Sequence, residues 1–100
     1  MSDFSFILPA NFSEYEREVE TKGWFSEATI IVSGERYQLN FYDAARLEQE
    51  MADELERGGL FFESNLVVVR SVTGANMERA AHQLVKADRV KFLVPDSGIG

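Results

Sequence analysis

The sequence predicts an α+β fold: a single sheet of four to five mostly antiparallel strands, with two long helices packed mainly on one face. Short segments rich in aromatic and β-branched residues separate two longer segments whose apolar residues recur at helical spacing. Eight Phe, three Tyr and one Trp among 100 residues supply more aromatic surface than disordered chains carry. We therefore expect one α+β domain over residues 1–100, ending in a tail at 95–100.

In the first half, residues 4–8 are predicted to form a strand that Pro9 ends, because proline cannot donate to a sheet ladder. Ser13 and Glu16 have the spacing of a capping box, which predicts a short N-terminal helix from residue 13 to about Lys22. Gly23 would end this helix. Residues 24–32 and 36–42 are separated by a turn sequence and predict an antiparallel hairpin with one buried face.

In the second half, Asp43 is a natural N-cap for a long helix that the glycines at 58 and 59 end. We expect its apolar stripe to join the core; the stripe consists of Ala44, Leu47, Met51 and Leu55. Residues 65–70 predict a strand buried on both faces. A second long helix is predicted to begin at Thr73 or Asn76 and to reach about residue 85. Residues 89–94 predict the last strand, as the end of a parallel crossover.

The composition excludes several kinds of site. The chain has no Cys, so disulfides, thiol catalysis and cysteine-based zinc sites are excluded. One His cannot build a multi-histidine metal site, and no phosphate-binding glycine motif occurs. We expect no metal and no cofactor. The sequence also lacks a basic signal region and an apolar run of about 20 residues, so we expect a cytoplasmic protein without a membrane segment.

The charge is uneven along the chain. Residues 1–63 contain fourteen acidic and five basic residues, whereas residues 64–100 contain three acidic and five basic ones. A net charge of −7 disfavours binding to nucleic acid and to anionic membranes, and it favours encounter with a basic protein. Solubility alone is the simpler explanation of the same charge.

Two adjacent aromatic pairs, at 24–25 and 61–62, lie in the acidic part of the chain. Neighbouring side chains of a strand point to opposite faces, so one member of each pair is expected at the surface. The leading hypothesis is a non-enzymatic interaction module (an inhibitor, adaptor or immunity-type protein) that binds a basic protein through aromatic anchors and carboxylates. The candidate residues are Phe12, Tyr15, Trp24, Tyr42, Glu50, Asp53, Glu54 and Phe61. Packing of the rings within the core is the competing interpretation, and a homodimer is left open.

Glu48 supports an alternative function. On a helical wheel it falls inside the apolar sector of the helix that follows Asp43. An unpaired carboxylate there is costly, which would fit a small enzyme or ligand-binding domain with Glu48 in a helix–sheet or dimer-interface pocket. The structural interpretation is a long side chain that snorkels to the edge of the sheet or pairs with Arg or Lys.

Overall fold

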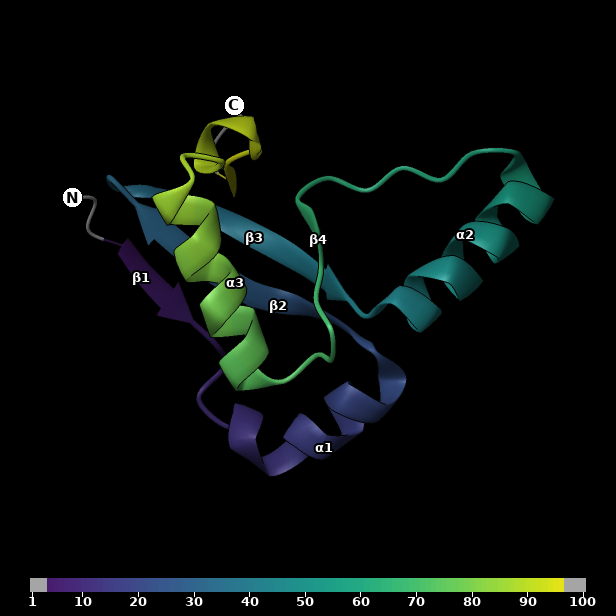
Figure 1. Ribbon diagram of the computed structural model, residues 1–100, viewed down its shortest axis with the longest axis horizontal. Helices are drawn as coiled ribbons and strands as arrows, with labels where there is room; N and C mark the ends of the chain where they lie inside the picture. The colour runs from purple at the N-terminus through teal and green to yellow at the C-terminus, as the bar shows by residue number, and fades with distance from the viewer. Residues whose placement is uncertain (1–3, 97–100) are drawn as a thin grey trace.

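Within residues 4–96, four strands form one sheet in the order β1-β2-β3-β4 (Figure 1). The computed structural model describes residues 4–96. The β1–β2 and β2–β3 pairs are antiparallel, while β3 and β4 are parallel, so the sheet is mixed and mostly antiparallel, as predicted. The elements are β1 (Phe4–Ile7), α1 (Phe12–Lys22), β2 (Trp24–Val32), β3 (Glu35–Tyr42), α2 (Ala44–Gly58), β4 (Leu66–Val68), α3 (Gly74–Lys86) and the 3-10 helix η1 (Val90–Phe92).

The core lies between one face of the sheet and the helices α1 and α3 (Figure 1). Alternate residues of β2 and β3 point toward these helices, because side chains of a strand alternate between faces. The residues of the core are Phe12, Val19, Phe25, Ala28, Ile30, Leu39, Phe41, Val72, Met77 and Ala81. The predicted packing of helices on one face is therefore confirmed for α1 and α3.

The predicted capping box at the start of α1 is wrong. The N-cap is Asn11, two residues before the predicted Ser13, and it makes no side-chain hydrogen bond. Glu16 does not reach back within α1, because its carboxylate accepts a hydrogen bond from the backbone of Gly74 at 2.8 Å. Tertiary packing of α1 against the start of α3 has replaced the local contact.

β4 is shorter and more exposed than predicted. It forms the edge of the sheet beside β3, and Val68 is 47% exposed, so the expected burial on both faces is wrong. The parallel crossover also occurs one unit earlier than predicted, since α2 connects the parallel strands β3 and β4. Only β3 pairs with β4, so β4 is an edge strand and its side chains are only partly covered.

The strand predicted at residues 89–94 is absent, and η1 occupies this place. Asp88 adopts a left-handed backbone (φ 58°) that ends α3 in a tight turn. The chain then folds back onto the end of α3, where Arg89 N donates to Leu84 O at 2.8 Å. Val94 is held by Asn65, whose side-chain oxygen accepts from its amide at 2.8 Å, in place of a sheet ladder.

Only part of the expected tail lies within the described residues. Asp96 is anchored, because its carboxylate accepts a hydrogen bond from the backbone of Gln38 at 3.3 Å. Residues 97–100 of the predicted tail lie outside the described residues.

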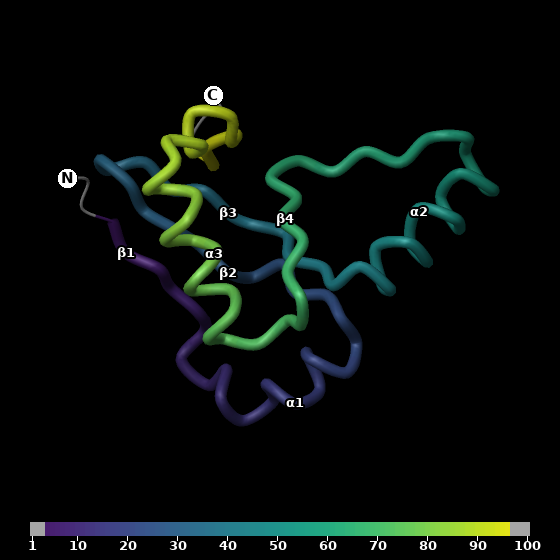
Figure 2. The backbone as a smooth tube through the Cα atoms, viewed as in Figure 1, coloured from purple at the N-terminus to yellow at the C-terminus, as the bar shows by residue number. Residues whose placement is uncertain are grey.

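The helix α2 extends away from the sheet, and the segment after it returns beside it as the other side of a projecting arm (Figures 1 and 2). Asp43 caps α2 as predicted, with its carboxylate accepting from Arg46 N at 2.8 Å. No residue of α2 is buried, and Leu55 is 53% exposed. The expectation that this apolar stripe joins the core is therefore wrong, because α1 and α3 already cover the sheet face. Within residues 4–96, no helix is long and apolar enough to cross a membrane.

Candidate functional site

The candidate site is an open cavity of about 580 Å³ in the projecting arm. One wall is the acidic side of α2, the opposite wall is the segment that returns from it, and the last residue of β3 lies between them. The lining residues are Tyr42, Glu50, Glu54, Leu60, Phe61, Phe62 and Glu63. We refer to this set as the arm cavity.

Two backbone hydrogen bonds, one at each end of α2, position the walls of the arm cavity. At the base of the arm, Asp43 N donates to Gly23 O at 2.9 Å, which fixes where α2 starts relative to α1 and β2. At the tip, Gly59 ends α2 in a left-handed conformation (φ 73°), and its amide donates to Leu55 O at 3.0 Å. This helix ending is the common glycine C-cap, and it turns the chain so that residues 60–63 lie opposite α2.

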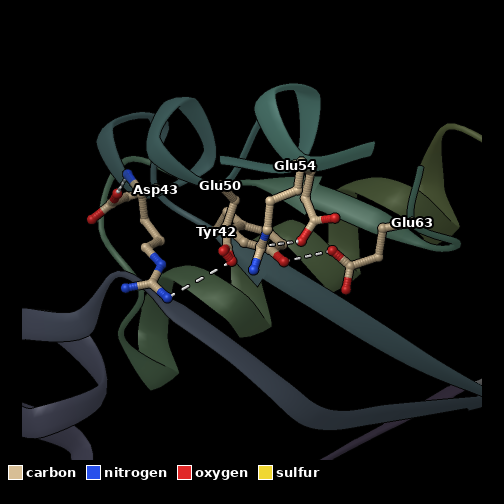
Figure 3. A network of polar contacts seen from close by, with 7 residues as sticks. Tyr42, Asp43, Glu50, Glu54 and Glu63 are labelled. Carbon is tan, nitrogen blue, oxygen red and sulfur yellow. Dashed lines mark hydrogen bonds and ion pairs between the residues drawn. The ribbon is translucent and has the colours of Figure 1, made fainter. Parts of the chain in front are cut away.

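Tyr42 and Glu63 form a short hydrogen bond within the arm cavity. The Tyr42 hydroxyl donates to the Glu63 carboxylate at 2.5 Å (Figure 3). Burial raises the pKa of Tyr42 well above its ordinary value, and the hydrogen bond to Glu63 and the charges of Glu63 and Glu50 raise it further. The phenol therefore remains a neutral donor at physiological pH.

Glu50 and Glu54 point from α2 toward the same space as Tyr42 (Figure 3). Each has an arginine neighbour on the helix: Glu50 lies 3.9 Å from Arg46, and Glu54 lies 2.7 Å from Arg57. The Arg57 side chain is 68% exposed, and exposed pairs of this kind contribute about 0–1 kcal/mol. The Glu54–Arg57 pair is therefore weak, and Glu50 lies near the limit of ion-pair distance from Arg46.

The rim of the arm cavity is apolar. Leu60 is 67% exposed and Phe62 is 80% exposed, while Phe61 is half-buried between them. Carboxylates beside exposed apolar side chains can bind the ammonium or guanidinium end of a long side chain while covering its methylene stem. Chemically, the arm cavity fits a lysine or arginine side chain.

The structure brings together four of the eight residues that the sequence singled out for partner binding: Tyr42, Glu50, Glu54 and Phe61. Tyr42 is only 4% exposed, so it lies at the floor of the cavity and its expected place at the surface is wrong. Tyr15 and Trp24 instead line a separate hollow of about 130 Å³ beside α1. Asp53 is exposed on α2 and lines neither hollow. Phe12 is 6% exposed within the core, so its expected place at the surface is wrong. Its ring packs against Phe25 at 5.1 Å between centroids.

Sequence reasoning missed Leu60, Phe62 and Glu63. The aromatic pair 61–62 carried a usable signal, since one member was expected at the surface and Phe62 is there. Leu60 and Glu63 lie in an irregular segment, where no periodicity indicates which way a side chain points.

Glu48, the alternative functional acid, is exposed on α2 and does not line the arm cavity. Glu48 is exposed because the apolar face of α2 does not join the core, so the buried setting that made Glu48 a candidate is absent. Among residues 4–96, no group of three or more acidic or histidine side chains is arranged to hold a metal ion. Comparisons of this chain with protein-family models, curated proteins and solved structures found no match.

Proposed function

We propose that this chain is a non-enzymatic interaction module that binds a basic protein, and that the arm cavity receives a lysine or arginine side chain of that partner. The observation that carries this proposal is the grouping of Glu50, Glu54 and Glu63 around one open cavity with an apolar rim.

We expect an incoming cation to compete well with Arg57 for the carboxylates of the arm cavity. Arg57 reaches only Glu54, at an exposed position where the pair contributes little. A cation inside the arm cavity would approach the carboxylates from both walls, in a site that its own stem and the rim shield from water.

The whole-chain charge assists the encounter. A net charge of −7 attracts a basic protein before contact and raises the association rate at low salt. Phe62 and Leu60 then supply apolar surface at the rim, and aromatic side chains commonly act as anchors of protein interfaces.

The test is a titration with a short, unstructured peptide rich in lysine and arginine, followed by two-dimensional NMR of the labelled chain. We expect shift changes at Tyr42, Glu50, Glu54 and residues 60–63, and weaker binding as salt is added. The double variant Glu50→Gln/Glu54→Gln should bind several-fold more weakly.

A control variant separates site binding from general attraction. Glu20→Gln/Glu78→Gln removes the same amount of charge at two exposed positions outside the arm cavity. The proposal requires this control to retain most of the affinity. Equal losses in both double variants, or shift changes spread over the whole acidic surface, would refute it.

A further inference from the structure

The helix α2 has a second face that the arm cavity does not use. Leu47, Met51 and Leu55 repeat every fourth residue and form a stripe about 12 Å long, at 1.5 Å per residue. None of the three is buried, and Leu55 is 53% exposed. Helices of this length are marginal in water and gain most of their stability from packing an apolar face. The α2 stripe, as we call these three residues, has only part of such packing among residues 4–96, because Leu47 and Met51 are half-buried and Leu55 is exposed.

The geometry points to a basic amphipathic helix of the partner protein, packed along the α2 stripe. This inference rests on the proposed function and names the structural element that brings the cationic side chain to the arm cavity. Glu54 lies next to the stripe on the helix and also lines the cavity, so the two surfaces are continuous.

The spacing of the stripe favours a helix as its occupant. Apolar residues at every third or fourth position of a second helix would meet Leu47, Met51 and Leu55 in turn, at an axis separation of about 8–10 Å. A strand would need an open backbone edge for pairing, and the backbone groups within a helix are already bonded to one another.

Charge favours a basic occupant over a second copy of this chain. The helix α2 carries five carboxylates and two arginines. Glu48 and Glu54 flank the stripe, each about 60° from its centre at 100° per residue. Flanking positions of this kind set partner choice in paired helices through opposite charges. Two α2 helices would bring like charges together, whereas lysine or arginine on both sides of an apolar stripe would pair with them.

The test uses a synthetic peptide of about 18 residues, a length suited to a helix, with leucines at helical spacing and lysine or arginine elsewhere. A scrambled peptide of the same composition keeps the charge and loses the apolar face. By isothermal titration calorimetry, we expect the amphipathic peptide to bind more tightly, and Leu55→Gln to weaken it about tenfold. The same variant should leave binding of the scrambled peptide unchanged.

Phe92→Gln is the matched control, because Phe92 is exposed (72%) on η1, outside both the α2 stripe and the arm cavity. It should leave both affinities unchanged. If the two peptides bind equally and both depend on Glu50 and Glu54, the helix inference is overturned while the proposed function stands. If neither peptide binds, the proposed function fails as well. Sedimentation that shows a dimer of the wild-type chain, lost in Leu55→Gln, would instead assign the α2 stripe to a second copy and overturn the inference.

Discussion

The Glu16 carboxylate accepts a hydrogen bond from the backbone amide of Gly74 at 2.8 Å, which joins α1 to the first turn of α3. Thr73 completes this turn, because its hydroxyl accepts from Asn76 N at 3.1 Å. A carboxylate at a helix N-terminus satisfies a free amide and also interacts favourably with the helix dipole. The contact therefore holds together the two helices that cover the sheet.

Replacing Glu16 with Ala should lower the free energy of unfolding by about 1 kcal/mol, the usual cost of losing a capping acceptor. Urea denaturation measures this loss. Glu20→Ala on the same helix is the control, since Glu20 is exposed, and it should change stability much less. Equal effects of the two substitutions would show that the contact with Gly74 contributes nothing.

Helix starts were predictable from the sequence only where the cap is local. Asp43 and Thr73 cap α2 and α3 through amides three residues later, so their spacing is visible in the chain. Glu16 has the same apparent signal, but its amide partner lies 58 residues away. No local pattern distinguishes a carboxylate that caps its own helix from one that caps another.

The contact between Tyr42 and Glu63 should make stability depend on alkaline pH. The pKa of Tyr42 is raised above its ordinary value of 10.0, so folding favours the protonated phenol. Its contribution is complete below about pH 10 and is lost progressively as the pH rises above that value. Tyr42→Phe should lose about 1–2 kcal/mol at neutral pH, because the Glu63 carboxylate loses its donor.

Urea unfolding at about pH 8 and about pH 11 measures this pH dependence. The wild-type chain should lose more stability between the two conditions than Tyr42→Phe does. An identical decrease in both proteins would mean that the Tyr42 hydroxyl titrates in the folded chain as it does in the unfolded one.

Gly23 is required at the junction of α1 and β2 for two separable reasons. Its backbone is left-handed (φ 74°), and an added Cβ would lie 2.5 Å from an Asp43 carboxylate oxygen. Gly34, in the turn between β2 and β3, is also left-handed (φ 82°), but a Cβ there meets nothing within 4 Å. Gly34→Ala should therefore cost about 1–2 kcal/mol, the price of backbone strain alone.

Gly23→Ala should cost more than Gly34→Ala, because it also displaces the cap that starts α2. Thermal unfolding of both variants measures the difference, and circular dichroism should show a loss of helix only for Gly23→Ala. If the two variants have the same melting temperature, the close approach of Asp43 to Gly23 does not constrain the arm.

Periodicity predicted that α2 is an amphipathic helix, but not what covers its apolar face. The same spacing of Leu47, Met51 and Leu55 would suit a helix packed on its own sheet or one packed on another protein. The difference arises between β3 and α2, where the chain leaves the sheet in a direction that only the tertiary structure defines (Figure 1). For the same reason, the sequence indicated Glu50 and Glu54 as surface acids without indicating that Glu63 lies opposite them.

Leu55→Ala tests whether the apolar face of α2 serves folding or binding. Because Leu55 is 53% exposed, we expect its truncation to change the free energy of unfolding by no more than about 0.5 kcal/mol. Leu39→Ala, at a fully buried position of β3, should cost about 2–5 kcal/mol in the same urea titration. A large loss for Leu55→Ala would place α2 against the body of the chain in solution and would leave no free α2 stripe for a partner. A small loss combined with weaker binding of the amphipathic peptide would assign Leu55 to recognition.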